Sequence, residues 1–80
     1  MTVEVRLYAT LAEHVDGAEA AEPFGQELPE GSTIVDLIDR LGLPEAEVHL
    51  VIVDGRLVHD PATLLSDKSR VALFPPVGGG

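Results

Sequence analysis

The residues with the most distinctive chemistry are the last six of the chain, Pro75-Pro76-Val77-Gly78-Gly79-Gly80. Neither proline can donate a backbone hydrogen bond, so the pair cannot continue a strand inside a sheet and favours an extended exit from it. The three glycines that follow have no side chains that could pack in a core. The only reactive group in this segment is the α-carboxylate of Gly80, and residues 78–80 are thin enough to enter a narrow channel in another protein.

A carboxylate is inert until it is activated. Transfer of AMP from ATP would convert Gly80 into a mixed anhydride, which a sulfur or amine nucleophile can attack. The segment therefore predicts a carrier whose terminus is the substrate, and a chain that is not itself an enzyme. The alternative is a frayed terminus or a linker remnant, because glycine tails occur in both. Pro75-Pro76-Val77 is unlike such linkers and favours a function.

The other polar residues do not suggest a second site. His14, His49 and His59 lie on different predicted elements without the spacing of metal ligands, so we expect no metal site and no bound cofactor. Asp36 and Asp39 are three residues apart and could be mistaken for an acid–base pair. Their position on the polar side of a predicted helix favours solvation instead.

The composition predicts one small acidic domain. The chain has 80 residues, no cysteine and a net charge of −9. We expect one folded domain over residues 1–74 and a C-terminal tail over residues 75–80. The charge argues against nucleic acid and anionic membranes, which require basic surfaces. It suits a basic protein partner, and the alternative is a surface that is acidic for solubility alone. The lack of cysteine and of a signal sequence predicts a cytoplasmic protein.

Several segments have strand patterns. Residues 3–7 alternate between apolar and polar side chains, which predicts a strand with one buried face. Residues 48–53 are apolar on both faces except at His49, which is typical of a central strand covered by a helix. Asp54-Gly55 has the sequence of a type I′ turn, so residues 56–58 are predicted to return beside that strand.

The clearest helix begins after Thr33. Apolar side chains recur at the spacing of one helix face, at Ile34, Leu37, Ile38 and Leu41. Thr33 and Asp36 have the spacing of a capping box, and Gly42 stands where a helix commonly ends. The helix boundaries are therefore predicted from both ends.

Weaker patterns fill the rest of the chain. Residues 9–14 can form one or two helical turns, and residues 24–28 are predicted as an edge strand. In the loop that starts at residue 60, we expect Leu64 and Leu65 to plug the underside. Together with a last strand over residues 70–74, this element order predicts an α+β roll.

The predicted last strand leaves two positions open for the side chain of Phe74. Val71 and Leu73 share one face of residues 70–74, and Ala72 and Phe74 share the other. If Val71 and Leu73 meet the helix, Phe74 faces outward, and a large exposed aromatic residue marks a docking surface. The alternative is that Phe74 belongs to the core.

Residues 73–80, Leu-Phe-Pro-Pro-Val-Gly-Gly-Gly, resemble the C-terminal signature of the ubiquitin-like sulfur-carrier family. Within this family they are more similar to the small subunit of molybdopterin synthase than to the thiamine-pathway carrier. The usual ending is Phe-Pro-Pro-Val-Ala-Gly-Gly, so Gly78 stands where alanine is common. Residues 3–9 and 31–38 are also similar to the family. Asp54-Gly55 replaces a frequent Asn-Gly pair, and both suit the turn.

The resemblance implies a β-grasp fold, with a mixed sheet of four to five strands packed on one main helix. It also implies that an E1-like adenylyltransferase/sulfurtransferase uses MgATP to adenylate Gly80, and that sulfur from a persulfide then gives a thiocarboxylate. In molybdopterin synthase the large subunit receives the tail and holds the catalytic residues. Phe74 would dock the partner, Pro75, Pro76 and Val77 would aim the tail, and Gly78, Gly79 and Gly80 would reach the active site.

Three alternatives remain open at the level of sequence. The chain can be a ubiquitin-like modifier that is joined through Gly80 to lysine side chains. It can be a sulfur carrier for thiamine or another sulfur-containing metabolite. It can also be an inert domain with a frayed tail.

Overall fold

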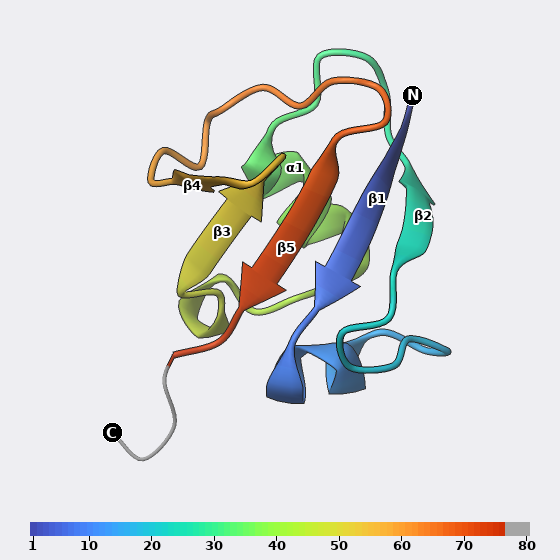
Figure 1. Cartoon of the computed structure of the whole chain (residues 1–80), viewed down its shortest axis with the longest axis vertical. Helices are drawn as coiled ribbons and strands as arrows, with labels where there is room; N and C mark the ends of the chain where they lie inside the picture. The colour runs from blue at the N-terminus through green and yellow to red at the C-terminus, as the bar shows by residue number, and fades with distance from the viewer. Residues whose placement is uncertain (77–80) are drawn as a thin grey trace.

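The computed structural model describes residues 1–76 as a five-stranded mixed sheet with one α-helix packed on one face (Figure 1). In chain order the elements are β1 (Thr2–Leu7), the 3-10 helix η1 (Ala9–His14), β2 (Phe24–Glu27), α1 (Ile34–Leu41), the 3-10 helix η2 (Glu45–Glu47), β3 (Leu50–Val53), β4 (Arg56–Val58) and β5 (Arg70–Phe74). The strand order is β2-β1-β5-β3-β4. Only the central pair, β1 and β5, is parallel, and the other three pairs are antiparallel. This is a β-grasp, ubiquitin-like fold, as the family resemblance implied.

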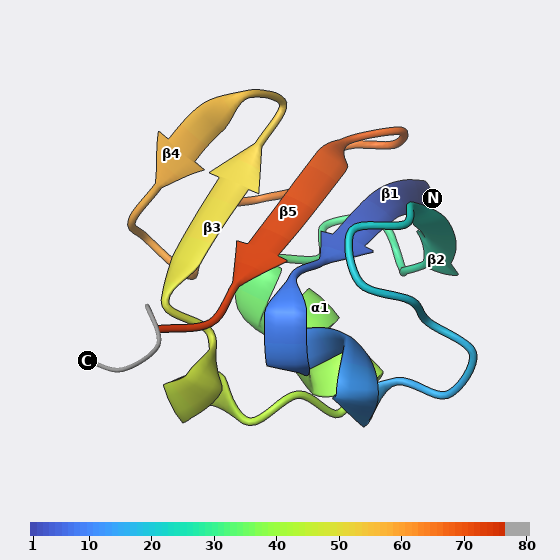
Figure 2. The same ribbon diagram turned by 60° about the horizontal axis from the view of Figure 1, so that its bottom comes forward.

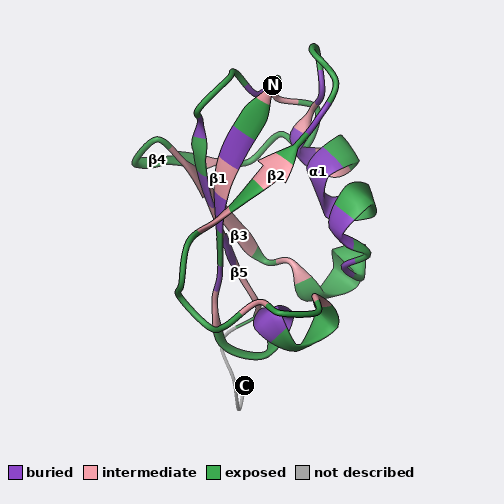
Figure 3. Cartoon of the chain, turned by 90° about the vertical axis from the view of Figure 1, so that its right-hand side faces the viewer, coloured by how far each residue is buried: buried purple, intermediate pink, exposed green. Residues whose placement is uncertain are grey.

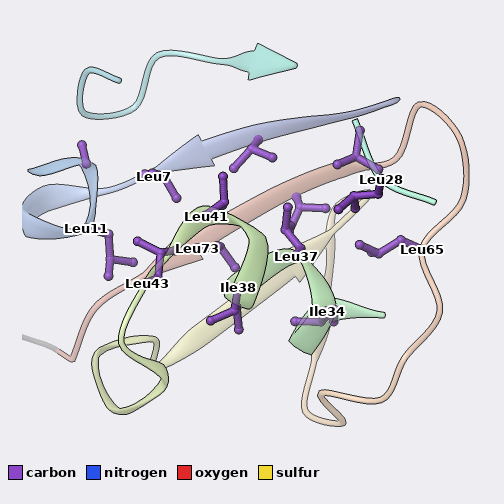
Figure 4. Close-up of a cluster of buried hydrophobic side chains, with 14 residues drawn as sticks. Leu7, Leu11, Leu28, Ile34, Leu37, Ile38, Leu41, Leu43, Leu65 and Leu73 are labelled. Carbon is purple, nitrogen blue, oxygen red and sulfur yellow. The ribbon is translucent and has the colours of Figure 1, made fainter. Parts of the chain in front are cut away.

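The core lies between α1 and the inner face of the sheet (Figure 4). Alternation on the two central strands sends Val5, Leu7, Val71 and Leu73 inward, and each of them is at most 1% exposed. Leu37 on α1 is fully buried against this layer. The predicted apolar stripe of the helix is therefore the face that packs on the sheet.

Both ends of α1 have the predicted geometry. The Thr33 hydroxyl accepts a hydrogen bond from the Asp36 backbone N–H, and the Asp36 carboxylate accepts one from the Thr33 N–H. Gly42 ends the helix in the left-handed region, with a φ of 73°. The capping box and the glycine stop are both confirmed.

The hairpin between β3 and β4 is also confirmed. Val53 pairs with Arg56, which leaves Asp54 and Gly55 as a two-residue turn with φ values of 49° and 83°. These positive values suit a type I′ turn. The Asp54 carboxylate also accepts a hydrogen bond from the Arg70 N–H at 2.9 Å, so the turn is fastened to the first residue of β5.

Two expectations about strand and loop residues were wrong. The strand predicted over residues 48–53 begins at Leu50, because the Val48 N–H closes the last turn of η2 by donating to the Glu45 carbonyl. Its position is as predicted, because β3 is an interior strand paired with β5 on one side and β4 on the other.

In the loop that was expected to bury two leucines, Leu65 is 5% exposed but Leu64 is 67% exposed. Leu64 bridges to Thr33, and the Leu65 N–H donates to the Ser32 carbonyl. The loop is therefore extended beside the start of α1, and adjacent side chains of an extended chain point in opposite directions.

The two exposure values generate a test of the core. Replacing Leu37 with alanine should lower the free energy of unfolding by roughly 2–5 kcal/mol, because it opens a cavity under the sheet. The matched Leu64→Ala change should cost less than about 1 kcal/mol, since that side chain is already in water. Urea denaturation followed by circular dichroism measures both, and equal losses would contradict this account of the core.

Candidate functional site

The candidate site is the end of β5, where the chain leaves the sheet towards its C-terminus. On one side the Tyr8 N–H donates to the Leu73 carbonyl at 3.1 Å. On the other side the His49 N–H donates to the Phe74 carbonyl at 2.8 Å. The last residues of β5 are therefore fixed by both neighbouring strands, and the direction in which Pro75 leaves is set by the sheet.

Phe74 lies on the outer face and its ring is stacked on that of Tyr8. The two ring centroids are 4.2 Å apart, with an angle of 13° between the planes. Phe74 is half-buried by this contact, while its neighbour Leu73 is fully buried on the inner face. The expected outward orientation of Phe74 is confirmed, whereas its role in docking stays a prediction.

Tyr8 is the residue that sequence reasoning missed. It follows β1 on the same face as Arg6, and the parallel register joins Leu7 to Leu73. The alternation pattern therefore already indicated that Tyr8 and Phe74 face outward. Their contact could be inferred only with the knowledge that β1 and β5 are neighbours. Parallel neighbours far apart in sequence carry no local signature.

An apolar surface continues from this aromatic pair over the outer face of the sheet, which α1 leaves uncovered (Figure 3). The register places Leu50 beside Phe74 in one row. In the next row Ile52 lies between Ala72 and Leu57, and Leu57 is 51% exposed. We call this surface, made of Tyr8, Leu50, Ile52, Leu57, Ala72 and Phe74, the outer apolar face.

The site residues predicted beyond β5 are only partly within the described structure. Pro75 is half-buried and Pro76 is exposed, and neither belongs to a strand. Val77, Gly78, Gly79 and Gly80 lie outside the described residues. Figures 1 and 2 show that β5 ends at the same end of the sheet as η1 and η2.

The histidines take two different positions. His14 Nε2 lies 2.7 Å from Glu47 Oε2, which joins η1 to η2. His49 and His59 line one cavity of about 280 Å3 between α1 and the β3–β4 hairpin, with Glu45 and Asp60. Among residues 1–76, no three acidic or histidine side chains gather closely enough to hold a metal ion. No helix in this described part is long and apolar enough to span a membrane.

The strand order and the packing of α1 on the sheet define a ubiquitin-like β-grasp protein. The chain matches the model of the ThiS family over residues 5–80, and it belongs to that family. The matched range includes the whole run from Phe74 to Gly80. A comparison with curated proteins gives no match.

Solved structures support the same assignment. The Helicobacter pylori protein solved as a complex of subunits 1 and 2 of molybdopterin-converting factor includes a chain that is 26% identical, with 100% of both chains covered and a TM-score of 0.65. The Haloferax volcanii HVO 2177 protein is 28% identical over 100% of this chain and 87% of its own, with a TM-score of 0.76. Small archaeal modifier protein 1 of H. volcanii, at 23% identity and a TM-score of 0.71, covers 95% of this chain and 98% of its own and shows the fold alone.

The stacked rings should be energetically coupled. In a double-mutant cycle of Tyr8→Ala and Phe74→Ala, we expect a coupling free energy of about 0.5–1.5 kcal/mol. Either single change already removes the contact between the rings, so the second change cannot remove it again. The control cycle pairs Tyr8→Ala with Leu57→Ala, which lies three strands away, and should be additive. Urea unfolding of all variants supplies the data. Additive behaviour of Tyr8 and Phe74 would show that the stack does not stabilise the exit of β5.

Proposed function

We propose that this chain is a sulfur carrier whose C-terminal Gly80 is adenylated and then converted to a thiocarboxylate. We further propose that it donates this sulfur in molybdopterin biosynthesis, as the small subunit of molybdopterin synthase. The observation that carries the proposal is the family match through the Phe-Pro-Pro-Val-Gly-Gly-Gly run, which continues from a strand end fixed by two neighbours. The molybdopterin role is supported by the likeness to the H. pylori subunit, which was solved in complex with a second subunit.

The chemistry requires groups that this chain does not have. The Gly80 carboxylate would attack the α-phosphorus of ATP, so that an acyl-adenylate forms and pyrophosphate leaves. A persulfide on the activating enzyme would then attack the acyl carbon and expel AMP, which leaves an acyl disulfide. A second thiol would cleave the sulfur–sulfur bond, giving the Gly80 thiocarboxylate and an enzyme disulfide. Since the chain contains no cysteine, the persulfide and the second thiol both belong to its partners.

The outer apolar face supplies a docking surface for these partners. Tyr8, Leu50 and Phe74 adjoin the exit of β5, so a partner that holds the tail is brought against this part of the face first. Large aromatic side chains of this kind contribute strongly to interfaces. We place the catalytic residues of the sulfur-transfer step on the large subunit, and in this chain Pro75, Pro76 and Val77 aim the three glycines.

Removal of the terminal pair tests the carrier role. Deleting Gly79 and Gly80 should abolish sulfur loading, because the remaining carboxylate no longer reaches the activating site. The melting temperature should stay unchanged, because glycines add no side chains to the core. Intact-mass measurement of N-terminally tagged protein from its own cells, without alkylation, should show a population heavier by one oxygen-to-sulfur exchange only in the full-length chain.

The matched control is Gly78→Ala, which introduces the residue that is common at this position in the family and should keep loading. A truncated chain that still carries the heavier species would contradict the role of Gly80. A large drop in melting temperature on truncation would show instead that the tail is part of the folded domain.

A second candidate function, a protein modifier, shares the first chemical step. The acyl-adenylate of Gly80 can be passed to a lysine amine as well as to sulfur. The fold likeness to small archaeal modifier protein 1 is compatible with this route but carries the fold alone. The modifier function is therefore supported by the chemistry of the Gly80 carboxylate and not by the structural likeness.

Conjugates distinguish the two functions. If the chain is a modifier, an N-terminally tagged form should appear in lysates as a ladder of larger species that resists boiling and reduction. The same tag on the chain lacking Gly79 and Gly80 should give one band. A carrier alone gives one band in both cases, and a ladder that persists after truncation would exclude conjugation through Gly80.

A further inference from the structure

Two arginines flank a hollow in the outer face of the sheet, one row of residues away from the aromatic pair. Arg6 pairs with Ala72 across β1 and β5, and Arg70 pairs with Glu4. The hollow has a volume of about 270 Å3, and its lining includes both arginines, Ala72 and Ile52. Ala72 has the shortest side chain in a row whose other members are Arg6, Ile52 and Leu57, so the depression lies where its side chain ends.

The two guanidinium groups at this hollow are only loosely paired with the carboxylate beside them. Arg6 Nε lies 3.5 Å from one Glu4 carboxylate oxygen, and Arg70 Nε lies 4.0 Å from the other. Both separations exceed the roughly 2.7–3.2 Å of a good hydrogen bond. The Asp54 carboxylate also lies at this edge, where it accepts a hydrogen bond from the Arg70 backbone N–H. Glu4 and Asp54 therefore balance the two arginines in charge, but both guanidinium groups keep N–H donors that the loose ion pairs with Glu4 do not use. The Arg70 side chain is 79% exposed and accessible to a partner.

The surroundings indicate what kind of group this hollow accepts. A guanidinium group is suited to a carboxylate because its fork of donors matches two oxygens. On one side the hollow continues into Ile52 and Leu57, which a free small anion would leave exposed to water. An acidic side chain carried by an apolar protein surface satisfies both parts of the face at once.

We propose that this hollow receives an aspartate or glutamate side chain of the enzyme that adenylates Gly80, and that Arg6 and Arg70 bind its carboxylate. The inference rests on the proposed function and adds to it the charge of the partner surface. The activating enzyme is the partner required by both the carrier and the modifier functions. Because β5 carries both Arg70 and the exit at Phe74, an enzyme that covers the strand from the tail reaches the hollow about four residues further along.

The arginine pair sets orientation and partner choice, while the outer apolar face supplies contact area. An acidic group on the enzyme would be repelled by most of this acidic chain, whereas Arg6 and Arg70 offer it two guanidinium groups on the outer face of the sheet. A partner without such a carboxylate would cover Arg6 and Arg70 and leave them without an acceptor. This would lower its affinity for the chain. Binding that depends on such a pair weakens as the salt concentration rises.

The test is a kinetic comparison of variants matched in charge. ATP–pyrophosphate exchange is measured with the activating enzyme from the same organism, over a range of carrier concentrations. The double variant Arg6→Gln/Arg70→Gln and the control Arg40→Glu each lower the net charge by two, but Arg40 lies in the last turn of α1, away from the outer face. We expect the double variant to raise the KM for the carrier roughly tenfold with little change in kcat, and the control to change KM less than about twofold.

Two further variants test the hollow independently of whether the double glutamine variant folds. Single Arg70→Gln removes an exposed side chain, so it tests the hollow even if the double variant unfolds. Arg6→Lys/Arg70→Lys keeps the charge but removes the paired N–H donors of the guanidinium groups. It should recover only part of the affinity for the activating enzyme. If the double variant and Arg40→Glu have the same KM, the inference is overturned while the proposed function stands. If the unaltered chain is not adenylated at all, the proposed function fails and the inference fails with it.

Discussion

The parallel pairing of β1 with β5 is the constraint on which the rest of this molecule depends. It joins the first strand of the sequence to the last and forms the centre of the sheet. Because side chains alternate along a strand, burying Val71 and Leu73 under α1 forces Ala72 and Phe74 onto the opposite face. One packing requirement therefore stabilises the core, directs Phe74 outward and fixes the point where the C-terminal segment leaves. The exit needs no dedicated structure, since it follows from the strand that the core already holds.

Much of this arrangement could be predicted because its signals are local. Thr33, Asp36 and Gly42 specify the ends of α1 through contacts within a few residues, and Asp54-Gly55 specifies a two-residue turn in the same way. The face of Phe74 followed from simple alternation once a helix was placed over one side of the sheet. The β-grasp topology itself came from the resemblance, because no local pattern states which strands become neighbours.

The expectations that were wrong concern competition between neighbouring segments. Val48 is apolar enough for a strand, but its N–H is used by the turn of η2, so β3 starts at Leu50. Leu64 and Leu65 are equally apolar, and only pairing with Ser32 and Thr33 decides which one points inward. The stack of Tyr8 on Phe74 and the hollow between Arg6 and Arg70 arise from pairs more than sixty residues apart. Such contacts depend on tertiary register, which a single sequence leaves open.

The proposed function divides the work between this chain and its partners. A carrier that must serve more than one enzyme gains little from reactive side chains of its own, since each would have to be protected in every complex. What it can contribute is a rigid platform from which a substrate group projects, together with a surface that identifies it. Under the proposed function the platform is β5, held between β1 and β3, and the recognition surface would combine the outer apolar face with Arg6 and Arg70. If both proposals hold, β5 recognises the partner and the reaction takes place beyond its last residue. The residues that select a partner could then change without altering the group that reacts.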